Sequence, residues 1–226
     1  VITDITLGID EPNVMAQKAV EKVKLGFDTL KIKVGTGIEA DIARVKAIRE
    51  AVGFDIKLRL DANQAWTPKD AVKAIQELAD YQIELVEQPV KRRDLEGLKY
   101  VTSQVNTTIM ADESCFDAQD ALELVKKGTV DVINIKLMKC GGIHEALKIN
   151  QICETAGIEC MIGCMAEETT IGITAAAHLA AAQKNITRAD LDATFGLETA
   201  PVTGGVSLEA KPLLELGEAA GLGISH

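Results

Sequence analysis

The chain has little positive charge and no long apolar run, and each absence argues against a class of protein. Its 226 residues have a net charge of −10, which argues against nucleic acid or an anionic membrane surface as a partner. The longest apolar tract, residues 171–182, is interrupted by Thr174 and His178. It is also shorter than the roughly 20 residues that cross a bilayer. We therefore expect neither a nucleic-acid-binding protein nor a membrane protein.

Export signals and a disulfide framework are missing as well. No basic and apolar leader opens the chain. The five cysteines are odd in number and form no paired CxxC pattern, which favours reduced thiols that serve as packing residues. We expect a cytoplasmic protein. Because the chain begins at Val1 and not at Met, we also expect it to be a piece of a longer protein.

The composition is that of one globular domain. Apolar residues make up 47% and charged residues 26% of the chain, and a chain of this length can bury a large core. No low-complexity segment and no second domain is apparent, so we predict one domain over residues 1–226.

Eight β-like runs alternate with amphipathic helical patterns. The runs are residues 5–9, 29–34, 56–60, 83–86, 107–110, 130–137, 158–162 and 187–192. Thr67 followed by Pro68 predicts the start of one helix, and Gly26, Gly53, Gly128 and Gly157 are placed where helices should end. Strict alternation predicts parallel strands, and eight units predict an α/β fold closed into a TIM-type (β/α)7β barrel.

An open, doubly wound sheet is the structural alternative. That fold usually has a glycine-rich phosphate turn after its first strand, where this chain has Asp10-Glu11-Pro12-Asn13. The alternation stops after Asp192. Residues 199–205 are loop-like, and residues 212–220 predict at most one short helix.

Charged residues recur at the predicted strand ends in the order base, acid, acid, acid, base. They are Lys33, Asp61, Glu87, Asp112 and Lys136, separated by 28, 26, 25 and 24 residues. The three acids end neighbouring strands, so a barrel would bring their carboxylates to one ion. Three carboxylates suit Mg²⁺ first and Mn²⁺ second, whereas no histidine or cysteine ends a matching strand for Zn²⁺. The alternative is that these acids cap helices or are solvated.

The two lysines would lie on opposite sides of that ion. Lys33 ends the second strand and Lys136 the sixth, so they would approach a bound substrate from its two faces. Lys31 points to the same side of its strand as Lys33, and a neighbouring lysine and a divalent cation both lower the pKa of a lysine base. Lys139 and Lys148 fit ordinary surface lysines. The three histidines (His144, His178 and His226) offer no rival base.

A second acidic group ends the eighth strand. Asp190 and Asp192 would face the barrel mouth across from Glu87. A ligand joining the metal to this pair would have a carboxylate at one end and a cation at the other. A zwitterion two residues long, about 7 Å when extended, has that size. The alternative is a pair of solvated acids.

These segments together resemble the muconate lactonizing subgroup of the enolase superfamily, and within it the dipeptide epimerases. The resemblance runs from about Thr3 to Asp192. Its segments are Lys31-Ile32-Lys33, Leu60-Asp61-Ala62-Asn63-Gln64, Glu87-Gln88-Pro89, Asp112-Glu113-Ser114, Ile135-Lys136-Leu137, Gly163-Cys164-Met165 and Asp190-Leu191-Asp192.

The resemblance implies an isomerase that inverts an α-carbon of a dipeptide through a metal-stabilised enolate. Lys33 and Lys136 would exchange the proton, Asp61, Glu87 and Asp112 would bind Mg²⁺, and Asp190 and Asp192 would bind the dipeptide ammonium. Lys31 would support the substrate carboxylate and tune Lys33. Thr6, Cys164 and Met165 would be further substrate contacts.

The same resemblance implies an N-terminal capping domain, which is absent before Val1. We expect the cap in a missing segment or a separate chain, and a homo-oligomer is compatible with the sequence. The alternatives are another reaction of the subgroup (a cycloisomerase, an o-succinylbenzoate synthase or an N-acylamino acid racemase) and a non-catalytic barrel that lacks its cap.

Overall fold

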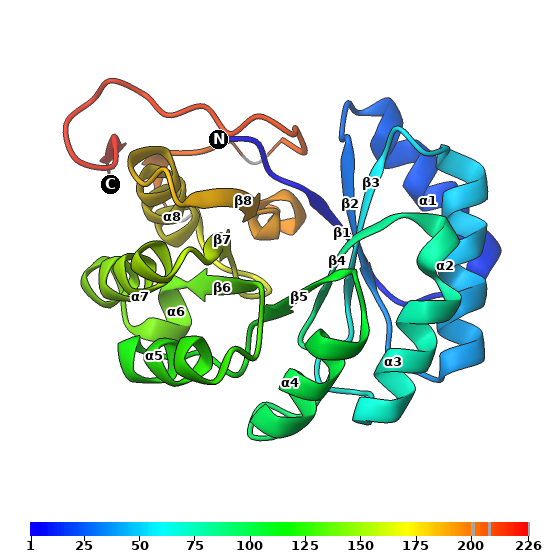
Figure 1. Ribbon diagram of the computed structural model, residues 1–226. Helices are drawn as coiled ribbons and strands as arrows, with labels where there is room; N and C mark the ends of the chain where they lie inside the picture. Colours follow the sequence, from blue (N-terminus) through cyan, green and yellow to red (C-terminus); the bar gives the residue numbers. More distant parts are fainter. Residues whose placement is uncertain (200–201, 208, 226) are drawn as a thin grey trace.

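All eight predicted strands form one parallel sheet in the order of the sequence. The structure is a computed structural model that describes residues 1–199, 202–207 and 209–225. The strands are β1 (Ile5–Leu7), β2 (Thr29–Lys33), β3 (Lys57–Asp61), β4 (Ile83–Glu87), β5 (Thr108–Ala111), β6 (Val132–Lys136), β7 (Glu159–Gly163) and β8 (Ile186–Asp190). Figure 1 shows the strands in the middle and the helices outside them. The predicted barrel is confirmed, and the open doubly wound alternative is wrong.

The first and last strands meet through a short seam that nearly closes the barrel. The Asp4 backbone N–H donates to Ala189 O at 3.2 Å, and the Leu191 N–H donates to Thr3 Oγ1 at 2.7 Å. At the mouth, the Thr6 N–H donates to Asp192 Oδ2 at 2.6 Å. Side chains therefore replace part of the backbone ladder at this seam.

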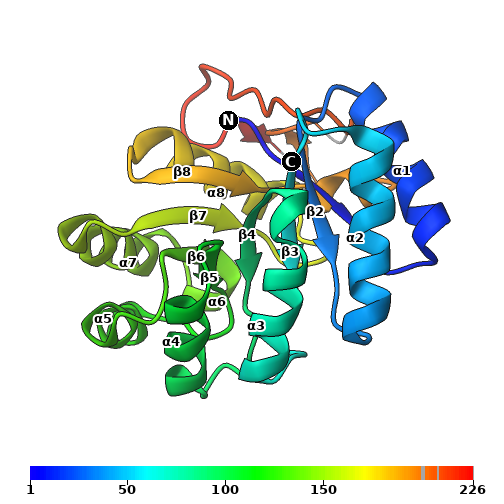
Figure 2. The same ribbon diagram turned by 45° about the vertical axis from the view of Figure 1, so that its right-hand side comes forward.

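The connecting helices lie on the outside of the strands (Figures 1 and 2). They are α1 (Pro12–Lys24), α2 (Ile38–Val52), α3 (Pro68–Glu77), α4 (Leu95–Gln104), α5 (Ala118–Lys127), α6 (Leu137–Cys140), α7 (Ile143–Ala156) and α8 (Thr170–Ala182), with the short 3₁₀ helices η1 (Ala79–Tyr81) and η2 (Ala193–Gly196). As predicted, Thr67 caps α3 by accepting from the Asp70 N–H. Gly128 and Gly157 end α5 and α7 in the left-handed conformation that glycine adopts most easily.

The interior of the barrel is apolar on one half and ionic on the other. Leu85, Met110, Val132 and Met161, from β4 to β7, form a buried cluster separate from the large core. On the other half, Lys31, Arg59 and Asp190 are buried on β2, β3 and β8. Buried charges are costly unless they are paired, so the ionic half must compensate its charges internally.

The segment after β8 runs beside the N terminus and forms no helix between residues 212 and 220. Leu213 bridges Ile2 in antiparallel fashion, and the Thr3 N–H donates to Pro212 O at 2.8 Å. These contacts hold the segment extended, which agrees with the expectation of at most one short helix there. Figure 1 shows this segment in red near the N terminus, with β9 (Thr203–Gly204) and β10 (Ile224–Ser225) pairing farther along. Among the helices of the described residues, none is both long and apolar enough for a bilayer.

Candidate active site

A cavity of about 280 Å³ lies at the carboxyl ends of the strands, and most of the predicted site residues line it. Eight of the eleven do so: Thr6, Lys31, Lys33, Lys136, Cys164, Met165, Asp190 and Asp192. In a barrel this end holds the active site. The other three, Asp61, Glu87 and Asp112, are almost completely buried beside it.

Strand register places the charged residues in two rows. Lys33 pairs with Asp61 across β2 and β3, and Asp61 pairs with Glu87 across β3 and β4. On the other side, Lys136 pairs with Gly163 and Gly163 with Asp190. Because the β/α units have similar lengths, the residues that end the strands lie at the same level along the barrel axis.

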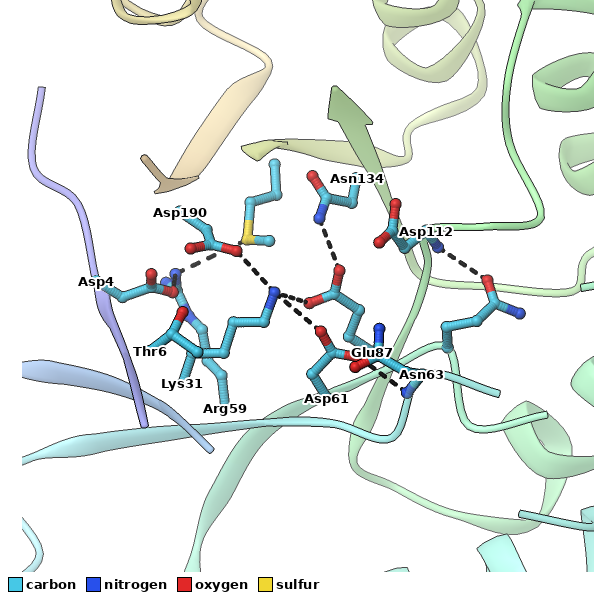
Figure 3. Close-up of polar contacts among 12 residues, drawn as sticks. Asp4, Thr6, Lys31, Arg59, Asp61, Asn63, Glu87, Asp112, Asn134 and Asp190 are labelled. Atoms are coloured by element: carbon cyan, nitrogen blue, oxygen red, sulfur yellow. Dashed lines mark hydrogen bonds and ion pairs between the residues drawn. The ribbon is translucent and has the colours of Figure 1, made fainter. Parts of the chain in front are cut away.

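Lys31 lies at the centre of the ionic half. Its Nζ is 3.0 Å from Asp61 Oδ2, 2.8 Å from Glu87 Oε2 and 2.7 Å from Asp190 Oδ2, as Figure 3 shows. Burial alone would lower the pKa of Lys31, but the carboxylates around it outweigh burial and raise that pKa well above its ordinary value. The Lys31 ammonium donates a hydrogen bond to Asp190 and forms ion pairs with Asp61 and Glu87. Its predicted contact with a substrate carboxylate stays a prediction.

The two predicted proton-transfer lysines bind opposite ends of the row of acids. Lys33 Nζ is 2.6 Å from Asp61 Oδ2 and 2.9 Å from Asn63 Oδ1, and its side chain is 30% exposed. Lys136 Nζ is 2.8 Å from Asp112 Oδ2, with its side chain 9% exposed. The two amines therefore belong to different walls of the cavity, β2 and β6.

The pKa values of Lys136 and Asp112 are shifted in opposite directions. Burial would lower the pKa of Lys136, but Asp112 and then Glu87 raise it above its ordinary value. Burial would raise the pKa of Asp112, yet the ammonium groups of Lys139 and Lys136 lower it. Lys136 and Asp112 thus form an ion pair in which both partners are charged.

Glu87 is the least compensated of the three acids. Burial, and then the neighbouring Asp61 carboxylate, raises its pKa to about 7, although Lys31 acts in the opposite direction. In contrast, Lys31 and Lys33 lower the pKa of Asp61 against the effect of burial. Additional positive charge beside the three acids would therefore stabilise the ionised form of Glu87 at neutral pH.

The donor set fits a hard divalent cation, although the three acids do not converge tightly. Three buried carboxylates on successive strands are the oxygen ligands that Mg²⁺ and Mn²⁺ prefer, and burial together with the neighbouring Asp61 carboxylate raises the pKa of Glu87. Across residues 1–199, 202–207 and 209–225, the one group of three ligand atoms that all lie within 4.8 Å of one another is Cys164, Asp190 and Asp192. Lysine amines bind the three acids instead.

The Asp190 and Asp192 side chains have different partners. Asp190 is bound by Lys31 inside the barrel, whereas Asp192 accepts the Thr6 N–H and a long 3.9 Å contact from Cys164 Sγ. Burial, and then the Asp190 charge, raises the pKa of Asp192. Met165 lies at the rim, 40% exposed. Asp192 is therefore the carboxylate of this pair without a cationic side chain bound to it in the described structure.

Comparison with known proteins fits this geometry. Residues 14–226 match the family described as enolase C-terminal domain-like. The chain belongs to this family.

Similar members of the family include named epimerases. The chain is 52% identical over 225 residues to the L-Ala-D/L-Glu epimerase of Bacillus subtilis, covering 98% of this chain and 61% of that protein. It is 49% identical over 224 residues to that of Clostridium acetobutylicum, covering 98% and 62%. It superposes with a TM-score of 0.96 and 39% identity on the crystal structure of the dipeptide epimerase from Cytophaga hutchinsonii complexed with Mg and dipeptide D-Ala-L-Val, covering 100% and 61%. The chain thus spans about three fifths of the length of the relatives it matches.

Two amides of this enolase-type barrel were not predicted as site residues. Asn134 Nδ2 donates to Glu87 Oε1 at 2.8 Å, and Gln88 Oε1 accepts the backbone N–H groups of Asp112 at 2.9 Å and Ser114 at 3.0 Å. The signal for Asn134 was its place two residues before Lys136, on the same face of β6. Gln88 has a φ of 36°, so strand alternation could not have placed its side chain.

Lys139 was predicted to be a surface lysine, and that prediction is wrong. Its side chain is 5% exposed, and its Nζ contacts the Asp112 carboxylate as well as Asp112 O at 2.5 Å and Asn134 O at 3.0 Å. The short helix α6 turns Lys139 back over the end of β5. The same prediction for Lys148 is confirmed, because its side chain is 48% exposed.

Proposed function

We propose that this chain is the catalytic barrel of a Mg²⁺-dependent dipeptide epimerase. The supporting observation is the placement of two lysines on opposite walls of one cavity, each bound to an acid that would hold the metal. Asp61, Glu87 and Asp112 would bind the cation, with Mn²⁺ as a second choice. When bound there, it supplies positive charge beside the substrate carboxylate and so favours loss of the neighbouring α-proton.

The lysines would move that proton. One lysine nitrogen accepts the α-proton as the C–H bond breaks, and the ammonium of the other donates a proton to the opposite face of the same carbon. Lys33 and Lys136 form ion pairs with Asp61 and Asp112. If those acids bound a cation instead, both lysines would lose the carboxylates that stabilise their charged forms.

Asp192 would receive the ammonium of the dipeptide, with Thr6, Cys164 and Met165 around it. Asp190 would support this pocket from below through its ion pair with Lys31. The separation of the pocket from the acid row would select a substrate with charges of both signs. A cap, a cytoplasmic location and a homo-oligomer are parts of the same proposal.

The two-base step is tested with single Lys33→Ala and Lys136→Ala variants of the full-length protein in deuterated water. Each variant should invert a dipeptide about 10²- to 10⁴-fold more slowly than wild type. Each should still exchange the α-proton of one stereoisomer, and the two variants should differ in which one. Lys148→Ala is the matched control. Inversion by both variants at the wild-type rate would show that the assignment is wrong.

The reaction type is tested with Asp192→Asn. A dipeptide reaction should be impaired, whereas a reaction of an N-acylated amino acid, which has no free ammonium, should change little. Asp190→Asn would discriminate less well, because Asp190 also binds Lys31 and its loss would disturb either reaction. Equal loss with both substrates would favour another reaction of the family.

A further inference from the structure

Asp4 is a buried acid directly beneath the proposed ammonium pocket. It precedes β1 at the seam of the barrel, and its backbone N–H donates to Ala189 O, next to Asp190. Its side chain has no exposed surface. Figure 3 shows Asp4 grouped with Arg59, Lys31 and Asp190 in the ionic half of the barrel. The proposed mechanism has no role for this group.

The cation beside Asp4 is shared with another acid. Arg59 Nη1 lies 2.8 Å from Asp4 Oδ2, while Arg59 Nε lies 2.6 Å from Glu84 Oε2. One guanidinium therefore serves two carboxyl groups. Lys31, the other nearby cation, already binds Asp61, Glu87 and Asp190. This half of the interior thus contains more acids than cations.

Two oxygens in this group are without donors. Asp4 Oδ1 and Asp190 Oδ1 are both buried, and neither has a hydrogen-bond partner among the described residues. Two ionised carboxylates cannot bond, because both are acceptors only. A single proton between the two groups turns one oxygen into a donor and satisfies both, which removes the cost of leaving buried polar atoms unpaired.

The electrostatic surroundings favour Asp4 as the group with the proton. Burial, and then the Asp190 carboxylate, raises the pKa of Asp4 well above its ordinary value. Arg59 and Lys31 act in the opposite direction, and Asp192 adds to the rise. Burial would raise the pKa of Asp190, but Lys31 outweighs burial and lowers that pKa.

We propose that Asp4 is a neutral carboxylic acid that donates a hydrogen bond to Asp190 Oδ1 and so positions Asp190 beneath the ammonium pocket. Asp190 then has Lys31 on one oxygen and Asp4 on the other, which leaves Asp192 to bind a ligand. Asp4 is a positioning residue and touches no reacting atom. Only its link to the substrate rests on the proposed function.

The decisive variant is Asp4→Asn. An asparagine amide keeps an oxygen for Arg59 and presents an N–H to Asp190, as the neutral acid does. In the unfolded chain Asp4 ionises above about pH 3.9, whereas in the folded protein it keeps its proton. Wild type should therefore unfold more easily as pH rises, and the ratio of its unfolding constant to that of Asp4→Asn should increase about tenfold per pH unit from pH 5.

Equilibrium unfolding in urea between about pH 5 and pH 8 measures this ratio. A ratio that does not change with pH would mean that Asp4 is ionised, which would overturn the proposal. Infrared difference spectra of wild type against Asp4→Asn give a second readout. The difference spectrum cancels the bands of acids that both proteins share, such as Glu87, so a carboxylic acid carbonyl stretch should remain on the wild-type side; its absence there would also overturn the proposal.

Asp41→Asn is the matched control. Asp41 is equally buried, but its oxygens accept from the backbone N–H of Gly35, from Arg44 Nη1 and from Trp66 Nε1. An amide there would point N–H groups at donors, so the Asp41 variant should lose stability where the Asp4 variant keeps it. If Asp4→Asn lost as much stability as Asp41→Asn at pH 7, Asp4 would be an ionised acceptor and the proposal would be wrong.

The link to substrate is tested in the full-length protein. Asp4→Val, which can donate nothing to Asp190, should raise KM for a dipeptide roughly tenfold, the value of one lost hydrogen bond to a charged group. Its kcat should change less, and Asp4→Asn should restore KM. A valine variant with unchanged KM would overturn the positioning role. If the valine variant does not fold, the asparagine measurements still decide, and they remain valid even if the proposed function fails.

Discussion

Lys139 offers the sharpest test of how the site is held together. Replacing it by Met keeps an unbranched chain of similar length and removes the ammonium. The change removes hydrogen bonds to Asp112 O and Asn134 O and an ion pair with the Asp112 carboxylate. Because the Lys139 side chain is only 5% exposed, water cannot replace these partners without entering the core.

The magnitude follows from what remains after the change. Breaking a buried ion pair by removing one partner costs about 3–5 kcal/mol. Lys136 still binds Asp112 Oδ2 at 2.8 Å, so the carboxylate is not left alone. We therefore expect the lower end of that range, about 3 kcal/mol. For a chain of this size that loss lowers the unfolding midpoint by roughly 6–12 °C.

Urea unfolding of Lys139→Met and of Lys148→Met provides the assay and its control. Lys148 pairs with Glu145 at 2.8 Å on the surface of α7, with its side chain 48% exposed. An exposed pair of that kind contributes at most about 0.5 kcal/mol. If the two variants had the same free energy of unfolding, Lys139 would not be the buried ion-pair partner that its contacts indicate.

Two further predictions concern Gly163 and Glu87. A Cβ on Gly163 would lie 2.6 Å from Asn134 Oδ1 and 3.0 Å from Lys136 Cε. Gly163→Ala should therefore displace Lys136 and slow a Lys136-dependent exchange, with little change in the unfolding midpoint. A lowered midpoint with an unchanged exchange rate would contradict this prediction. Because the pKa of Glu87 is raised to about 7, Glu87 without a cation keeps its proton in the folded protein while it ionises in the unfolded chain, so roughly 3 kcal/mol of stability is lost as pH rises from 4.5 to 7. Mg²⁺ affinity should then weaken about tenfold per pH unit below 7, with release of one proton, as calorimetry in two buffers can measure; equal affinity at pH 6 and pH 8 would exclude Glu87 as a ligand.

The positions of four predicted site residues could be predicted from their spacing in the sequence. Lys33, Asp61, Glu87 and Lys136 each occupy the last position of a strand, because every unit contains one strand and one helix of similar length. Strand register then brings these positions to one rim of the barrel. The order of residues along the chain was therefore enough to predict both the barrel fold and the end of the barrel at which the site lies.

Side-chain partners did not follow from that order. Lys31 contacts Asp190, 159 residues away in sequence, and Arg59 contacts Asp4, 55 residues away. Lys139 reaches Asp112 only because α6 turns its side chain inward. Electrostatic energy inside a protein depends on separations of a few ångströms, and only the closed barrel sets those separations. The spacing of residues in the sequence therefore predicted the topology of the barrel. The distribution of protons and charges among the buried acids depends instead on how the side chains pack in the folded structure.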